Sequence, residues 1–290
     1  MLIIFNPVAG RRRGGLLYRV LDLLTERGVA FELASTLYAG HAAQLAHQAA
    51  RDGATVVVAA GGDGTIAEIA NGLIGSDTSL GIIPLGTANV LSKEYNLPIT
   101  AHDIVNALMS KRCKYLWPGV AQLPDQQHLF IQMLGVGFDG AVVHGVRPGL
   151  KRAIGKGAYV WQSLHSAACY TFPPVNVRID GIAFQAANVI VSKGRLYGGA
   201  FMLAPEARPE APGFQVVLFE KPGLWPALLA GAALPWGLLP RCPGVRLIRA
   251  SHIEFAATDE RILAQADGDA LPVLPISVVD AQTPLSLIVG

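Results

Sequence analysis

Short apolar runs alternate with segments of helical periodicity over the first hundred residues of this 290-residue chain. The runs predict strands at 2–5, 29–35, 55–60 and 80–83, with helices at 15–27, 39–51, 66–73 and from Asn89 onward. This alternation is typical of a parallel sheet covered by helices on both faces, which binds ligands at the carboxyl ends of its strands. We therefore predict an N-terminal, doubly wound α/β domain.

The pattern changes after Trp117-Pro118-Gly119. A helix is predicted at 151–170, and short β-rich runs follow at 175–179, 187–192, 215–219, 245–248, 252–255, 276–279 and 285–289. Strands at this spacing favour a sandwich or barrel. We predict a nucleotide-binding domain at 1–118, to which 280–290 could return, and a β-rich domain at 119–279, with a site between the two domains.

Composition excludes several classes of protein. With 51% hydrophobic and only 15% charged residues, the chain is neither disordered, collagenous nor a coiled coil, and a net charge of +2 offers no basic stripe for nucleic acid. Cys113, Cys169 and Cys242 are too widely spaced to predict a disulfide framework or a zinc site. The N-terminal apolar run is too short for a signal peptide, which favours a cytoplasmic protein.

A stretch without charged residues extends from Pro222 to Pro240. Its length approaches that of a membrane span, but prolines and glycines interrupt it, and Trp225 and Trp236 suit a membrane surface better than a bilayer centre. A helical hairpin or buried loop and a membrane-interface patch both remain open.

A glycine-rich loop, Gly61-Gly62-Asp63-Gly64-Thr65, lies where a predicted strand meets a predicted helix. Glycines allow positive φ and close approach of backbone N–H groups, and a helix N-terminus attracts anions. Thr65 and Glu68 have the spacing of a capping box. The loop therefore predicts an anion site.

Asp63 needs a separate explanation, because a carboxylate among phosphate-binding amides repels phosphate unless a cation lies between them. It would then be a partner of nucleotide-bound Mg²⁺ or of an attacking hydroxyl. The alternative is a tight turn in which Asp63 accepts backbone N–H bonds.

The loop and several further motifs resemble those of the superfamily of diacylglycerol, sphingosine and NAD kinases. The further motifs are Asn6-Pro7-x-x-Gly10, Thr36, Pro84-Leu85-Gly86-Thr87-Ala88-Asn89, Gly135-Val136-Gly137-Phe138-Asp139, Lys151-Arg152, Tyr197-Gly198-Gly199, Ala204-Pro205-x-Ala207 and Asp267-Gly268-Asp269. They follow in family order over nearly the whole chain. Since the Ser-Pro-x-Gly-Ser-Thr segment of NAD kinases is absent, the bacterial diacylglycerol kinase-like lipid kinases are the best match.

This resemblance implies an N-terminal α/β domain and a C-terminal β-sandwich that enclose ATP. It implies a transferase of phospholipid metabolism that uses ATP and Mg²⁺ to phosphorylate a hydroxyl of diacylglycerol, a long-chain base or a ceramide-like lipid. The implied partners are a lipid substrate and a peripheral membrane surface, and a homodimer is left open. The alternatives are an NAD kinase and a catalytically lapsed nucleotide- or lipid-binding relative.

The resemblance also assigns roles to residues. The nucleotide-binding set is Asn6, Pro7, Gly10, Thr36, Gly61, Gly62, Asp63, Gly64, Thr65, Ile66, Thr87 and Asn89. Asp63 and Asp139 are the metal candidates, and Asp269, Asp267 and Asp63 are the catalytic candidates. Simpler roles stay open, with Asn6 as a turn former, Thr87 and Asn89 as helix caps, Asp139 as a domain tie and Asp267-Gly268 as a hairpin turn.

Three positions depart from the family pattern. Asp269 stands where the family has a glutamate that acts as general base, and its side chain is one methylene shorter. Either the backbone lies closer to the substrate, or Asp267 shares the work, or activity is weak. Val90 replaces an aspartate in the second glycine loop. Pro212 replaces an aspartate after Ala207, and a structural Mg²⁺ at that point would lack this carboxylate.

Overall fold

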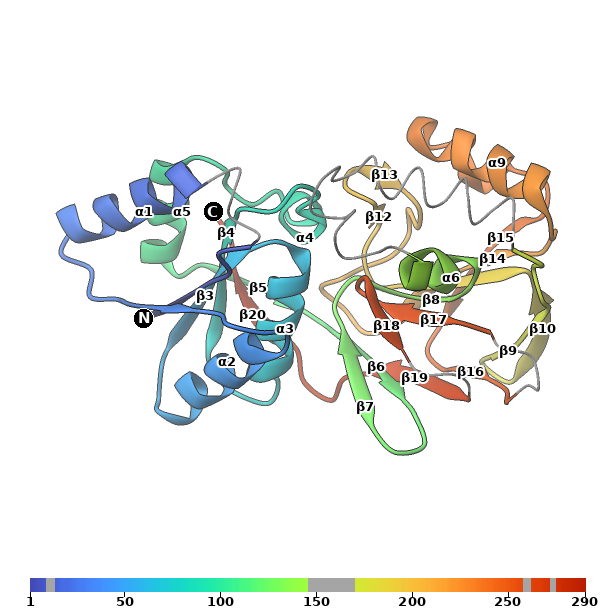
Figure 1. The fold of residues 1–290 in the computed structure, drawn as a ribbon, viewed down its shortest axis with the longest axis horizontal. Helices are drawn as coiled ribbons and strands as arrows, with labels where there is room; N and C mark the ends of the chain where they lie inside the picture. Colours follow the sequence, from blue (N-terminus) through green and yellow to red (C-terminus); the bar gives the residue numbers. More distant parts are fainter. Residues whose placement is uncertain (9–13, 146–169, 258–261, 272–274) are drawn as a thin grey trace. The chain divides into compact units, whose positions relative to one another are not determined.

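The computed structural model describes the chain except for residues 9–13, 146–169, 258–261 and 272–274 (Figure 1). Gly10, Lys151-Arg152, Cys169 and nearly all of the helix predicted at 151–170 therefore lie outside the described residues. The chain divides into two compact units. The first unit contains Met1–Trp117 and Gln282–Gly290, and the second contains Pro118–Ala281.

The first unit is built on a six-stranded sheet in the order β2-β1-β3-β4-β20-β5. Its strands are β1 (Leu2–Phe5), β2 (Glu32–Ser35), β3 (Val56–Gly61), β4 (Ser79–Pro84), β5 (Cys113–Leu116) and β20 (Leu285–Ile288). All neighbouring pairs are parallel except β20 with β5. The C-terminal run predicted at 285–289 thus belongs to this sheet, because β20 fits between β4 and β5.

Helices cover both faces of this sheet (Figure 1). The helix α1 (Gly14–Glu26) packs with α5 (Ala101–Ser110) on one face, where Leu17 and Val20 join Ile3 and Val58 in an apolar core. The helices α2 (His41–Arg51) and α3 (Asp63–Leu73) pack together on the other face, and a short helix α4 (Val90–Glu94) follows β4. The predicted α/β domain is confirmed.

The second unit is a β-sandwich of two six-stranded sheets, with the orders β10-β9-β16-β19-β6-β7 and β15-β14-β11-β8-β17-β18. The strands of the first sheet are β6 (Gly119–Gln122), β7 (Gln127–Phe130), β9 (Val175–Ile179), β10 (Ile182–Ala186), β16 (Ile253–Phe255) and β19 (Ile276–Asp280). The strands of the second are β8 (Met133–Gly137), β11 (Asn188–Ser192), β14 (Phe214–Phe219), β15 (Val245–Ala250), β17 (Ala264–Ala266) and β18 (Asp269–Leu271).

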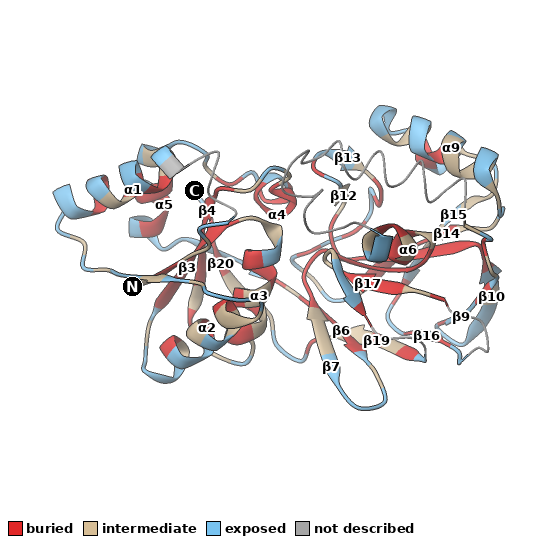
Figure 2. Cartoon of the chain, in the orientation of Figure 1, coloured by how far each residue is buried: buried red, intermediate tan, exposed pale blue. Residues whose placement is uncertain are grey.

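The two sheets share one apolar core, as the predicted sandwich requires (Figure 2). Strand β9 alternates buried and exposed positions, which is typical of a strand with one face in the core and one in water. The helix α6 (Phe138–Gly145) follows β8, and the pair β12 (Leu196–Tyr197) and β13 (Phe201–Met202) forms a separate small ribbon.

The uncharged stretch from Pro222 to Pro240 is not a buried loop. It folds into α9 (Leu224–Ala233) and two 3-10 turns, η2 (Leu234–Trp236) and η3 (Leu239–Arg241). Only Ala230 and Leu239 of this segment are buried, whereas Trp225 and Trp236 are each 79% exposed. In the described part of the chain, no helix has the length and apolar character needed to cross a bilayer.

Candidate nucleotide and catalytic site

Three loops with predicted site residues meet in the first unit because their strands are parallel neighbours. Asn6 follows β1, the loop of Gly61 to Thr65 follows β3, and Gly86 to Asn89 follow β4. The N–H of Asn6 donates to the carbonyl of Ala60, and the N–H of Gly86 donates to the carbonyl of Gly61. The carboxyl edge of the sheet therefore gathers the candidate nucleotide residues, as expected for this fold.

Asn6 connects two of these loops. Its side-chain Nδ2 donates to Oγ1 of Thr65 at 3.0 Å, and its Oδ1 accepts from the N–H of Val8 at 3.0 Å. The second bond is the turn-forming role that the sequence left open. The first ties the glycine loop after β3 to the loop after β1, so Asn6 fills both roles.

Gly61 and Gly86 of these loops serve close packing and not positive φ, contrary to the sequence-based expectation. None of Gly61, Gly62, Gly64 and Gly86 has a positive φ. A Cβ on Gly86 would lie 2.6 Å from Cα of Gly62, and a Cβ on Gly61 would lie 2.6 Å from Cβ of Thr65. A side chain at Gly86 would push the two loops apart, whereas one at Gly61 would collide with Thr65 of the same loop.

The N-terminus of α3 is the main hydrogen-bond donor of the site. Gly62 is its N-cap and provides no side-chain acceptor, and the N–H groups of the first turn have no intrahelical acceptor. The N–H of Asp63 interacts with the carboxylate of its own residue, which leaves the N–H groups of Gly64 and Thr65 for a ligand. Glu68 does not complete a capping box, because its Oε2 accepts from the N–H of Ala42 in α2. Ile66 contributes nothing to a ligand, since its side chain is buried and its N–H donates to the carbonyl of Gly62.

Asp63 links the two glycine loops. Its Oδ1 accepts from the N–H of Val90 at 2.6 Å, so the carboxylate caps α4. Burial raises the pKa of Asp63, and hydrogen bonds from the N–H groups of Val90, Leu91 and Asn89 oppose that shift. The geometry matches the alternative in which Asp63 accepts backbone bonds. It leaves Mg²⁺ at most one free ligand oxygen, so phosphate and water would supply the others.

The remaining nucleotide candidates follow β1, β2 and β4 of this sheet. Asn89 is the N-cap of α4 in a left-handed conformation, but its Nδ2 donates to the carbonyl of Gly86 at 2.8 Å and its side chain caps nothing. Thr87 and Pro7 are exposed, and the half-buried Thr36 donates its N–H to the carbonyl of Phe5.

Asp267 forms the turn of the β17–β18 hairpin. Asp267 and Gly268 both have positive φ, as a two-residue type I′ turn requires, and Ala266 pairs with Asp269. The Asp267 carboxylate accepts from the N–H groups of Ile131, Gln132 and Met133 at 2.6, 2.9 and 3.0 Å. These bonds occupy both oxygens, so Asp267 is poorly placed to accept a proton from a substrate.

Asp269, in contrast, is exposed at the start of β18. His128 on β7 lies close enough to Asp269 for the two side chains to interact electrostatically. Burial lowers the pKa of His128, and the negative charge of Asp269 opposes this shift. His128 is far from Asp269 in the sequence and lies outside every recognised motif, so this proximity could not be predicted from the sequence.

The environment of Asp267 predicts a pH-dependent stability. Burial raises its pKa to about 6, against the effect of its three backbone donors. The folded state therefore binds the Asp267 proton more tightly than the unfolded state does. The contribution of this proton to the free energy of unfolding is fully present below about pH 4 and is lost as the pH rises through 6. Relative to Asp267→Asn, wild type should lose roughly 3 kcal/mol of unfolding free energy between these limits.

Urea unfolding of both proteins at several pH values measures this difference. Asn does not titrate, so pH effects of other groups cancel in the comparison. A difference that is constant or grows in favour of wild type as pH rises would mean that the three N–H donors outweigh burial.

Asp139 is held within the second unit. Its Oδ1 accepts from the hydroxyl of Tyr197 and its Oδ2 from Nε2 of Gln265, both at 2.6 Å, while its N–H donates to Oδ1 of Asn188. Burial raises the pKa of Asp139. Both oxygens are thus engaged in packing α6 on its sheet, which argues against the predicted metal role. Across the described residues, no group of three or more His, Cys, Asp or Glu side chains could hold a metal ion.

Comparisons with known proteins agree with the division of the chain into two units. Residues 1–116 match the family described as "Diacylglycerol kinase catalytic domain", and residues 132–289 match the "YegS C-terminal NAD kinase beta sandwich-like domain". The chain is 30% identical over 244 residues to "Probable lipid kinase YegS-like" of Enterobacter sp. strain 638, covering 81% of this chain and 79% of the relative. This chain belongs to the bacterial diacylglycerol kinase-like lipid kinase family.

Other members of the lipid kinase family give the same result. The chain is 30% identical over 231 residues to "Diacylglycerol kinase" of Bacillus subtilis strain 168, covering 77% of this chain and 74% of the relative. A crystal structure of a diacylglycerol kinase from Bacillus anthracis strain Sterne has the same fold, with a TM-score of 0.73, 19% identity, and coverage of 100% of this chain and 96% of that one.

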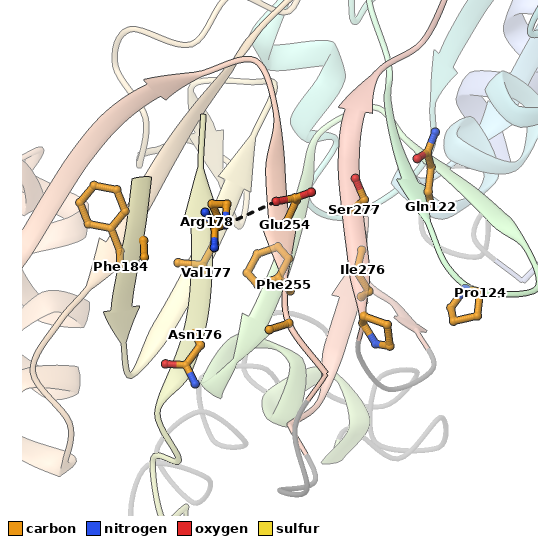
Figure 3. A pocket seen from close by; sticks show the side chains of 13 residues that line it. Gln122, Pro124, Asn176, Val177, Arg178, Phe184, Glu254, Phe255, Ile276 and Ser277 are labelled. Atoms are coloured by element: carbon orange, nitrogen blue, oxygen red, sulfur yellow. Dashed lines mark ion pairs between the residues drawn. The ribbon is translucent and has the colours of Figure 1, made fainter. Parts of the chain in front are cut away.

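A hollow on the outer face of the sandwich is separate from the residues that the lipid kinase family pattern predicts. It measures about 670 Å³ and lies over β9, β16 and β19, where an ion pair joins Nε of Arg178 to Oε2 of Glu254 at 3.8 Å (Figure 3). Its lining also includes Val177, Phe255 and Ile276, whose side chains belong to the apolar core between the two sheets. None of the predicted nucleotide, metal or catalytic residues lines it.

Proposed function

We propose that this chain transfers the γ-phosphoryl group of ATP to a hydroxyl of diacylglycerol or a related lipid. The observation that carries the proposal is the N-terminus of α3, which has no side-chain cap. The close contact between the backbones of Gly62 and Gly86 holds this helix end at the carboxyl edge of the sheet. Free N–H groups at a helix N-terminus stabilise phosphate through hydrogen bonds and the helix dipole. Family membership supports a kinase that acts on a lipid.

In the proposed reaction the lipid hydroxyl attacks the γ-phosphorus, and the bond to the β-phosphate oxygen breaks to release ADP. The N–H groups of Gly64 and Thr65 would bind phosphate oxygens, and the Asn6–Thr65 bond would keep that loop in position. Asp269 would accept the hydroxyl proton, since its carboxylate is exposed and that of Asp267 is engaged. Mg²⁺ would neutralise phosphate charge, with Asp63 as its carboxylate partner.

The acceptor is tested by incubating the purified protein with γ-labelled ATP and either NAD or a panel of diacylglycerol, long-chain base and ceramide in mixed micelles. Label in the lipid fraction and none in NAD is the expected result. Phosphorylated NAD without labelled lipid would favour an NAD kinase. Tight ATP binding without turnover on any lipid, unchanged in Asp269→Glu, would favour a lapsed relative.

We also propose that the protein reaches its substrate by peripheral binding to a membrane surface through residues 224–238. This segment exposes Leu224, Trp225, Leu229, Trp236 and Leu238, and the exposed cations Lys221 and Arg241 flank it. Tryptophan and leucine between basic residues suit the interface of an anionic bilayer.

Replacing both tryptophans, Trp225→Ala with Trp236→Ala, should weaken binding to vesicles of phosphatidylglycerol and phosphatidylcholine at least roughly ten-fold, because burying such a side chain contributes about 1.5–3 kcal/mol. Vesicle co-sedimentation measures the loss. Tyr18→Ala is a matched control, since it removes a 66% exposed aromatic side chain from the first unit. Unchanged vesicle binding would contradict the proposal, as would a dimer in solution that the double substitution dissociates.

A further inference from the structure

The second unit contains a lysine whose ammonium group is completely enclosed. Lys193 directly follows β11 and has 0% exposure. Its Nζ donates to the carbonyl oxygens of Ala211 and Gly213 at 3.1 and 2.9 Å and to Oδ1 of Asp280 at 2.7 Å. Lysine is rarely buried without partners, so this arrangement calls for an explanation.

The oxygen shell matches the capacity of the ammonium group. An ammonium has three N–H donors, and three oxygen acceptors surround Lys193. The ring of Phe214 covers a further side, with its centroid 4.8 Å from Nζ. Burial lowers the pKa of Lys193, and the hydrogen bond and charge of Asp280 oppose that shift.

The same carboxylate also holds the loop that carries the two carbonyls. Oδ2 of Asp280 accepts from the N–H of Gly213 at 2.7 Å, while Oδ1 accepts from Lys193. Asp280 ends β19 in one sheet of the sandwich, whereas Lys193 follows β11 in the other sheet. The cation therefore joins both sheets and the loop of residues 211–213.

Two carbonyl oxygens and a carboxylate form the kind of ligand set that a hard divalent cation takes. The family pattern has an aspartate where this chain has Pro212, whose side chain has no oxygen. The residues present do not fit Mg²⁺. A charge of +2 beside the single carboxylate of Asp280 would leave buried charge uncompensated, whereas one ammonium balances it. Separations of 2.7–3.1 Å also suit N–H···O bonds and exceed the roughly 2.1 Å of Mg²⁺–O bonds.

We propose that the Lys193 ammonium replaces a structural divalent cation in the β-sandwich of this chain. Lys193 and Asp280 then hold the loop of residues 211–213 permanently, and the second unit needs no metal at this point. This inference concerns the chain's own residues and does not depend on which acceptor the kinase uses.

Thermal unfolding of the nucleotide-free protein tests the proposal with Mg²⁺ or Ca²⁺ alone as the probe. The Tm of wild type should be the same in EDTA and in millimolar Mg²⁺ or Ca²⁺. The double variant Lys193→Ala with Pro212→Asp removes the ammonium and adds a second carboxylate. Its Tm should rise by roughly 5–10 °C when the cation is present at about one hundred times its dissociation constant.

Pro212→Asp alone is the matched control, because it adds the carboxylate but keeps Lys193 on the carbonyls. Its Tm should not respond to cations. Lys193→Met, which leaves Asp280 unpaired, should lower the Tm by roughly 10 °C.

Each result of the thermal unfolding experiment either supports or contradicts the proposed role of Lys193. A double variant that can be recovered folded only in Ca²⁺ also supports the proposal. The proposal is overturned if EDTA lowers the Tm of wild type and Mg²⁺ restores it, if Pro212→Asp alone gains the full cation response, or if the folded double variant shows none.

Discussion

Asp269→Asn should reduce kcat for lipid phosphorylation by a factor of roughly 10²–10⁴, the usual contribution of a general base. The exposed Asp269 carboxylate has no hydrogen bond from the described part of the chain, whereas that of Asp267 accepts three backbone bonds. Asn keeps the size and turn compatibility of Asp at this hairpin, so the fold should survive. Initial rates with γ-labelled ATP and diacylglycerol in mixed micelles measure the effect, and KM for ATP should stay unchanged.

Asp269→Glu is the informative companion, because it restores the longer acid of the family pattern. If Asp269→Glu has a kcat at or above that of wild type, the distance that the carboxylate at position 269 can span limits the rate of the wild-type enzyme. His128→Gln removes the imidazole near Asp269 and should lower kcat by less than Asp269→Asn does. An Asp269→Asn protein that keeps more than half of the wild-type kcat would exclude Asp269 as the base.

Gly86→Ala should both destabilise the first unit and impair use of ATP. The added Cβ would lie 2.6 Å from Cα of Gly62 and 2.7 Å from Oδ1 of Asn89. Backbone atoms cannot rotate away as a flexible side chain can, so we expect a loss of roughly 1–3 kcal/mol in the free energy of unfolding. Displacement of the α3 N-terminus by a fraction of an ångström should lower kcat/KM for ATP by roughly 10-fold to 100-fold.

Gly64→Ala controls for the effect of a methyl group on stability. Gly64 is exposed in the first turn of α3, and a Cβ there would have no heavy atom within 4 Å. Alanine in a helix is favoured over glycine, so Gly64→Ala should leave stability unchanged or raise it by up to about 1 kcal/mol. Equal unfolding free energies for Gly86→Ala and wild type would show that the two loops can separate without cost.

Much of the fold could be predicted from local patterns. The strand at Leu2–Phe5 has the predicted bounds, and the turn at Asp267-Gly268 forms as its residues favour. The helix α3 begins three residues earlier than its periodicity indicated, because Asp63 and Gly64 are helical but not apolar. Strands β5 to β8, β10, β17 and β18 were not among the predicted runs, because three to five residues produce too weak a periodic signal to be reliable.

The candidate site was predicted in its position but not in its contacts. Residues after parallel strands converge at one edge whatever their side chains, so the order of motifs was sufficient to predict that Asn6 and Thr65 would lie together. Their hydrogen bond and the approach of Gly62 to Gly86 depend on loop conformation. Burial likewise decided between a helical hairpin packed in the core and an exposed segment at 222–240, where uncharged composition is compatible with both.

The sequence by itself determined the two-domain organisation, the order of the glycine loops and the family, because periodicity and turn chemistry act over a few residues. Only the tertiary structure decided which carboxylates are engaged and which are exposed. Asp267 meets the N–H of Met133 across 134 positions of sequence, and Lys193 meets Asp280 across 87. Such encounters depend on how sheets pack, and patterns that extend over a few residues carry no information about that packing.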